Sequence, residues 1–241
     1  MTNDHQEMSF WQHLTELRKR LLYALIGIIV GIVVALVFAE QILDLVAKPI
    51  GGFDSLLSIE VTENIGVFMR VTLLGGFIVS LPFTFIQLYL FVQPALNPSE
   101  RRWVLLAVPL AVILFLVGAG FSYLVMLPNA IPVLVQFYGP EVLPKWKDYV
   151  DFVTSLIFWS GISFEMPLLA FVLARIGIIS AAQLLKGWRI AIIVIAFAAA
   201  LITPTGDPIN MIILMVPLIL LFALSILLAA LAKNDKQGEQ S

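Results

Sequence analysis

The chain has 241 residues, of which 61% are hydrophobic and only 12% are charged, whereas soluble domains average about 45–50% apolar and about 25% charged residues. A water-soluble fold cannot cover that much apolar surface, so we expect an integral membrane protein. The net charge of −2 does not suggest a nucleic-acid partner. Cysteine is absent and only His5 and His13 are histidines, so we expect no disulfide, no thiol catalysis and no zinc or iron site.

Six apolar segments are candidates for membrane-spanning helices, each of which needs about 20 residues to cross the hydrocarbon. They cover residues 21–39, 65–90, 103–127, 150–174, 190–202 and 209–232. An open sheet would leave backbone groups unpaired in lipid, so the predicted fold is all-α and polytopic. We divide the chain into an N-terminal cytoplasmic segment (1–20), a six-helix transmembrane domain (21–232) and a cytoplasmic tail (233–241), which we expect to be disordered.

An acidic residue lies just before the first span. Glu16 precedes Arg20 by four residues, a spacing that favours an ion pair along one helix. It also lies within about one turn of the membrane, where a carboxylate could bind a guanidinium group through charge-assisted bonds. Both interpretations are open on this pattern.

A second acid, Glu100, lies just before the third span. Ser99 could cap the helix that follows, and an acid in the first turn suits the helix dipole. Glu16 and Glu100 are nevertheless predicted at the same membrane surface, so the two carboxylates could together clamp a pair of guanidinium groups.

The fourth span contains an ionisable residue near its middle, Glu165, two residues before Pro167. A carboxyl group at that depth costs several kcal/mol unless it is paired, protonated or wetted. The proline frees the carbonyl of Ser163, one turn earlier. Arg70, near the outer end of the second span, is a distant candidate partner. These features favour a functional role for Glu165, with a buried, hydrogen-bonded acid as the alternative.

The fifth span is short. Its 13 residues, 190–202, would extend about 20 Å against a hydrocarbon core of about 30 Å. Either flanking residues extend the helix or the bilayer is thinner there, and in the second case the turn at residues 203–208 is submerged.

Lysine and arginine are unevenly distributed between the two sides of the predicted bundle. If the N-terminus lies in the cytoplasm, four lysines and arginines lie on the outer side of the membrane: Lys48, Arg70, Lys145 and Lys147. Ten lie on the cytoplasmic side: Arg18, Lys19, Arg20, Arg101, Arg102, Arg175, Lys186, Arg189, Lys233 and Lys236. Because positive charge is retained in the cytoplasm, both termini are predicted to be cytoplasmic, in the inner membrane.

The sequence contains no phosphate-binding loop, nucleophile elbow or catalytic acid pair, so we do not expect an enzyme. A proton-coupled small-molecule transporter, with Glu165 as the proton carrier, is a possible function. Such a protein should have further polar residues or broken helices along a midplane pathway, and few such residues are present.

Several motifs in order along the chain resemble the TatC family, the multispanning core subunit of the twin-arginine protein translocase. They are His13-Leu14-x-Glu16-Leu17-Arg18-x-Arg20, Pro82 with Gln87, Phe91-x-x-Pro94-Ala95-Leu96-x-x-x-Glu100-Arg101, Phe121-x-Tyr123, Ser163-Phe164-Glu165-Met166-Pro167, and Thr203-Pro204 with Asp207.

The resemblance implies a cupped bundle whose last two spans are short, acting as the receptor for twin-arginine signal peptides of folded cargo and driven by the proton motive force. It implies no cofactor, and it implies TatA and TatB as single-span partners, in a complex of multiple copies. The implied roles are signal-peptide binding for Glu16, Arg18, Phe91 and Glu100; a functional intramembrane acid at Glu165; functional outer-side positions at Pro49, Tyr123 and Asp207; and partner docking at Thr203 and Met211.

The last hairpin departs from the family pattern at two points. The family often has a glutamine shortly after the aspartate of the last hairpin, whereas the matching position here is Met211, and the turn is one residue longer at Gly206. The polar docking patch for TatA or TatB is therefore altered in this chain.

Overall fold

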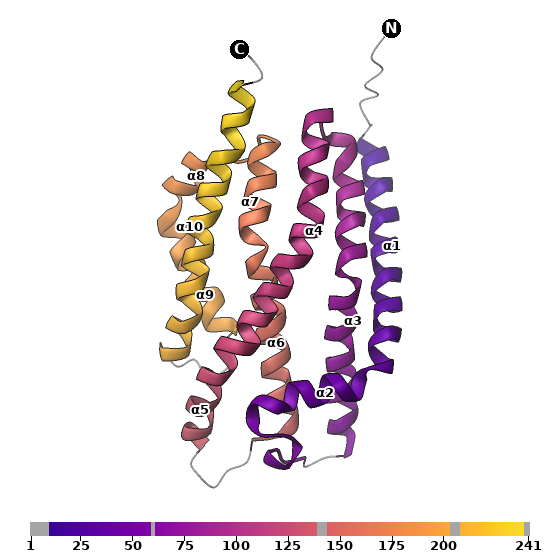
Figure 1. Cartoon of the computed structure of the whole chain (residues 1–241), viewed down its shortest axis with the longest axis vertical. Coiled ribbons are helices and arrows are strands. Elements are labelled where there is room, and N and C mark those ends of the chain that lie inside the picture. Colours follow the sequence, from indigo (N-terminus) through magenta and orange to yellow (C-terminus); the bar gives the residue numbers. More distant parts are fainter. Residues whose placement is uncertain (1–9, 59–60, 139–143, 203–207, 239–241) are drawn as a thin grey trace.

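The computed structural model describes residues 10–58, 61–138, 144–202 and 208–238, and these form an almost wholly helical protein (Figure 1). The α-helices are α1 (Phe10–Val37), α2 (Ala39–Ala47), α3 (Val61–Val92), α4 (Pro98–Phe121), α5 (Leu127–Tyr138), α6 (Trp146–Phe164), α7 (Met166–Arg175), α8 (Ala181–Lys186), α9 (Trp188–Ile202) and α10 (Pro208–Gly238). Short turns of 3-10 helix, η1 (Lys48–Ile50), η2 (Phe53–Ser55) and η3 (Gln93–Ala95), and a π-turn, η4 (Ser122–Met126), connect several of them.

The predicted all-α, multi-pass fold is confirmed. Five helical stretches are long and apolar enough to cross a membrane, and they match five of the six predicted spans: Trp11–Val37, Thr62–Val92, Glu100–Pro132, Trp146–Arg175 and Met211–Ala232. The fifth predicted span is α9, which has only 15 residues. The expectation that the last two spans are both short therefore holds for α9, whereas the span in α10 has 22 residues.

Helix α1 begins well before the apolar segment that predicted it. It runs without a break from Phe10 to Val37, so residues before the first span form a continuation of the same helix. Helix α10 similarly continues to Gly238, so most of the tail that was expected to be disordered is helical.

The fourth span is broken at Glu165. Helix α6 ends at Phe164 and α7 begins at Met166. Pro167 is the second residue of α7, where its missing N–H removes the hydrogen bond that would otherwise continue the helix. Glu165 is the single turn residue between the two helices, so its carboxyl group lies at their junction.

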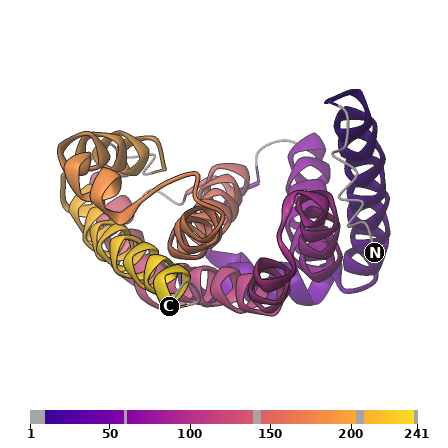
Figure 2. The ribbon, with the colours of Figure 1, turned by 90° about the horizontal axis from the view of Figure 1, so that it is seen from above.

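The helices follow a curve when seen from above, with α1 near one end and α9 near the other (Figure 2). Helix α1 packs along α3, α4 and α3 pack on α6, and α10 packs on α7 and α9. Glycine lets helices α1 and α3 approach each other closely, because a Cβ on Gly76 of α3 would lie only 2.5 Å from the Cα of Ile32 in α1. Large apolar side chains such as Leu25, Ile29 and Val33 remain exposed on the outside of α1, as expected for a surface that faces lipid.

The start of α1, the start of α4 and the end of α10 lie at one end of the bundle, and α2 and α5 lie at the other (Figure 1). The first and last described helices therefore begin and end on the same side of the bundle, as the even number of predicted crossings requires. The main apolar core lies between α3, α6 and α10, around Val71, Val153 and Leu214.

Candidate functional site

Glu16 is engaged in an ion pair within α1. The Nε of Arg20 donates to its Oε1 at 2.6 Å, and the Nη1 of Arg20 donates to Oε1 of Gln87 in α3 at 3.3 Å. The side chains of Glu16 and Arg20 are only 20% and 23% exposed. The ion pair favoured by the spacing is therefore formed, and Arg20 also connects the start of α1 to α3.

Phe91 lies at the same junction. Its ring stacks on that of His13 with 4.5 Å between the ring centroids and 26° between the planes. Together with the bond from Arg20 to Gln87, this contact fixes the start of α1 against the last turns of α3. Arg18 lies on the same helix turn as these residues but is exposed, so its guanidinium remains open to solvent.

Glu100 belongs to a capping box at the start of α4. The N-cap is Asn97, with Pro98 at the first position and Glu100 at the third, so the expectation that Ser99 caps this helix is wrong. The backbone N–H of Asn97 donates to Oε2 of Glu100 at 3.1 Å, and its side-chain amide donates to the same oxygen at 3.3 Å. Pro98 explains the shift, because proline is favoured at the first helical position and places the cap one residue before it.

These residues come together at one end of the bundle, where α1 begins, α3 ends and α4 begins (Figure 1). The two carboxylates lie in an otherwise basic setting, with Arg18, Arg101 and Arg102 exposed near them in the sequence. Glu100 is 5% exposed, and Glu16 is partly covered. A ligand guanidinium could therefore bind here only by sharing or displacing bonds that already exist.

Glu165 lies buried at the break between α6 and α7. The residue is 8% exposed, and its carboxyl group lies next to the backbone of Phe115 in α4. Its Oε1 has no hydrogen-bond partner among the described residues. A buried polar atom of this kind is unusual and suggests a site that water or a partner group satisfies.

Arg70 is not the partner of Glu165. Its Nη1 lies 3.0 Å from Oδ1 of Asp151, its Nε donates to Oγ1 of Thr154 at 2.8 Å, and its Nη2 donates to Oγ of Ser155 at 2.8 Å. Sequence reasoning missed this network, which joins α3 to α6. The polar residues at positions 151, 154 and 155, one helical turn apart, are the signal that could have found it.

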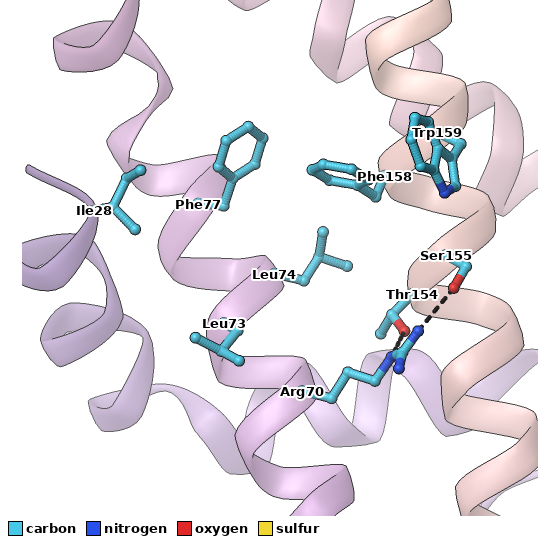
Figure 3. Close-up of a pocket in the computed structure, with 9 residues that line it drawn as sticks. All are labelled: Ile28, Arg70, Leu73, Leu74, Phe77, Thr154, Ser155, Phe158 and Trp159. Carbon is cyan, nitrogen blue, oxygen red and sulfur yellow. Dashed lines mark hydrogen bonds between the residues drawn. The ribbon is translucent and has the colours of Figure 1, made fainter. Parts of the chain in front are cut away.

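The network forms the polar end of an open cavity of about 380 Å³ (Figure 3). The remaining walls are apolar or aromatic and come from α1, α3 and α6; they are Ile28, Leu73, Leu74, Phe77, Phe158 and Trp159. The cavity therefore presents a guanidinium group at one end of a hydrocarbon-like surface.

Tyr123 and Pro49 lie in neighbouring parts of the opposite end of the bundle. The Tyr123 hydroxyl, in η4, donates to the carbonyl of Leu45 at 2.7 Å, and the Tyr149 hydroxyl donates to that of Val46 at 2.9 Å. These two bonds hold the end of α2, and η1 with Pro49 follows directly. Gly51 and Gly52 then turn the chain back with φ values of 98° and 100°, which favour glycine.

The last hairpin is described only in part. Thr203 and Asp207 lie outside the described residues, whereas Met211 lies in the first turn of α10, half-buried against the main core. Within the described ranges, no group of three or more histidine, aspartate or glutamate side chains is arranged to hold a metal ion.

Comparison with known proteins identifies a family. The model of the family described as Sec-independent protein translocase protein (TatC) matches residues 12–217. Proteins named Sec-independent protein translocase protein TatC are similar over most of both chains. The protein from Koribacter versatilis is 37% identical (97% of this chain, 90% of that one), and the protein from Deinococcus radiodurans is 34% identical (95% and 88%).

Two solved structures have the same fold. One, described as the crystal structure of twin arginine translocase receptor TatC, superposes with a TM-score of 0.79 at 31% identity and covers 91% of this chain and 99% of its own. The other, the same receptor in DDM, gives a TM-score of 0.81 at 30% identity and covers 90% and 99%.

Proposed function

The chain belongs to the TatC family of Sec-independent protein translocase proteins, and we propose from this that it is the signal-peptide receptor and core subunit of a twin-arginine translocase. In this role it binds the signal peptide of a folded cargo protein at the cytoplasmic surface. Transport across the inner membrane then uses the proton motive force. TatA and TatB are the proposed single-span partners, in a complex that contains several copies of this chain.

One observation carries the proposal: Glu16, Phe91 and Glu100 come from three different helices and lie at the same end of the bundle. Arginine pairs are recognised by carboxylates through charge-assisted bonds of fixed geometry. Two acids held by α1 and α4 on either side of α3 provide such acceptors. The exposed guanidinium of Arg18 adds a positive charge beside Glu16. This end is the cytoplasmic surface in the proposed orientation, because most of the lysines and arginines lie there.

Other positions have proposed roles away from the receptor surface. The unsatisfied Oε1 of Glu165 suits a group that acts during transport, when a proton, water or a partner's polar group reaches it. Pro49 and Tyr123 belong to the outer region that the Tyr123 hydroxyl holds together, and Asp207 is proposed to act on the same side. Thr203 and Met211 are the proposed docking positions for TatA or TatB.

A transporter for a small molecule is the alternative. The helix break at Glu165 is the one feature that favours it, because transporters use broken helices at the membrane midplane. Membership in the translocase family favours protein transport instead.

The experiment is export in a bacterium that lacks its own TatC protein. Together with TatA and TatB, this chain should restore export of a folded reporter that has a twin-arginine signal, and a proton uncoupler should stop that export. The same reporter with a twin-lysine signal is the matched control. Export that is absent, or that does not distinguish the two signals, would contradict the proposal.

A further inference from the structure

Arg20 occupies the carboxylate that is proposed to receive a signal-peptide arginine. Its Nε lies 2.6 Å from Oε1 of Glu16, which is a short distance even for a charge-assisted N–H···O hydrogen bond. A guanidinium that binds Glu16 through both carboxylate oxygens needs Oε1 as well. Such bidentate binding requires Arg20 to release that oxygen, so one guanidinium is exchanged for the other.

The position of Arg20 is fixed from a second helix. Its Nη1 donates to Oε1 of Gln87 in α3 at 3.3 Å, and Gln87 is only 7% exposed. This bond holds the guanidinium over Glu16 and leaves less freedom than an exposed pair on a single helix would have. The stacking of Phe91 on His13 holds α1 against α3 at the same height in the bundle. It therefore helps to keep Arg20 within reach of both Glu16 and Gln87.

We propose that Arg20 is an internal competitor that lowers the affinity of the site for any cationic ligand of Glu16. This inference rests on the proposed function as a signal-peptide receptor. A guanidinium from the peptide can replace Arg20, because it offers the same planar set of donors to the carboxylate. Every ligand that takes Oε1 of Glu16 must release Arg20, so the cost of that release is the same for each ligand. The preference for arginine over lysine then comes from the bidentate geometry and weaker hydration of the guanidinium itself.

The test is binding of two peptides to the purified full chain in lipid nanodiscs. One peptide has the twin-arginine signal and the other has lysine at both positions. Arg20→Gln removes the competitor and keeps a polar side chain next to Gln87. We expect it to bind the twin-arginine peptide about fivefold more tightly, as expected from release of one partly screened ion pair. The twin-lysine peptide should gain by the same factor, because it must release the same ion pair, so the ratio of the two affinities should stay unchanged.

Lys19→Gln is the matched control. Lys19 is exposed on the same helix, and its loss changes the net charge by the same amount, so it should leave both affinities unchanged. Gln87→Leu removes the anchor without changing charge and should raise both affinities, as Arg20→Gln does.

The outcomes separate this inference from the proposed function. If Arg20→Gln weakens binding of the twin-arginine peptide, or leaves it unchanged, then Arg20 does not compete for Glu16, and the inference is overturned. If the unaltered protein binds neither peptide, the proposed function itself fails. A change in Lys19→Gln equal to that in Arg20→Gln would show a general charge effect and would also overturn the inference.

Discussion

At the scale of single residues, the buried carboxyl group of Glu165 is the feature that the fold explains least. Several buried hydroxyl groups here bond to a backbone carbonyl one turn away, as Ser80 does to Phe77 and Ser225 does to Leu221. Oε1 of Glu165 has no such partner among the described residues. Leaving a buried acceptor unsatisfied costs about 1–3 kcal/mol of folding free energy. An apolar side chain would fill this position without that cost, so packing alone does not explain a glutamate here.

Glu165→Gln should therefore separate transport from binding. The amide keeps the size and hydrogen-bonding capacity of the side chain but removes its ability to ionise. We expect export of a twin-arginine reporter to fall severalfold, while affinity for the signal peptide stays within about twofold of that of the unaltered protein, because the two sites lie in different parts of the bundle. Ser163→Ala, which removes only a bond to the carbonyl of Trp159, is the control. Equal loss of export and binding would contradict this assignment.

Residue contacts were predictable from the sequence only where they are local. The pair of Glu16 with Arg20 follows from a spacing of four on a helix, and it is present. The bond from Arg20 to Gln87 joins residues 67 positions apart, and the pair of Arg70 with Asp151 joins two spans. Neither could be predicted, because the relative rotation and height of two helices depend on packing and are not encoded in any local pattern.

At the scale of helices, the contact between α1 and α3 depends on glycine. A Cβ on Gly76 would meet the backbone of Ile32 at 2.5–2.6 Å, and a Cβ on Gly27 would meet the ring of Phe83. Small residues at such a seam let two membrane helices approach closely, which strengthens their van der Waals contact. Since α1 has α3 as its main neighbour, this seam holds α1, and with it Glu16, in place.

Gly76→Leu should accordingly detach α1. We expect a loss of about 1–3 kcal/mol or more in stability, the usual cost of overpacking, measured as a lower midpoint of thermal unfolding in detergent. Gly66→Leu, on the same helix, is the control, because a Cβ there has nothing within 4 Å. If both variants unfold at the same temperature, the seam does not have the proposed role.

The existence of the helices was predictable, and their ends were not. Apolar length located every long span, because lipid leaves few alternatives to a helix. The interruption at Glu165 follows from Pro167, because proline removes a backbone donor inside the span. The start of α1 at Phe10 was not predicted, because it lies in a polar extension that hydropathy does not record.

At the scale of the whole molecule, the bundle has spans of unequal length. The 15 residues of α9 extend only about 22 Å at about 1.5 Å per residue, short of a hydrocarbon core of about 30 Å. A short span is accommodated by thinning of the bilayer around it. Helix α9 lies near one end of the curved row of helices (Figure 2), so thinning would be confined to that side of the protein.

Cysteines introduced at Thr203 and Asp207, just after the end of α9, should report this thinning. We expect both to react more slowly with a membrane-impermeant thiol reagent than a cysteine at Ser58. Ser58 is exposed near the β-bridge between Leu57 and Lys145, on the side that is proposed to face outward. Since the native chain has no cysteine, each label reports one position. Equally fast labelling at all three positions would count against a submerged turn.

The central claim is that Glu16 and Glu100 bind arginine through their charge, apart from any role in holding the helices. Glutamine tests this directly, because glutamine at the third helical position also supports a capping box. Asn97→Ala is the structural control, since it weakens the cap of α4 and leaves the charge of Glu100 in place.

The most direct measurement is therefore the affinity of the purified protein for a twin-arginine peptide in the unaltered form, in Glu16→Gln, in Glu100→Gln and in Asn97→Ala. The account predicts strong loss of affinity in both glutamine variants and near-normal affinity in Asn97→Ala, with weak binding of a twin-lysine peptide throughout. Affinity that survives both glutamine substitutions, or that falls only in Asn97→Ala, would contradict it.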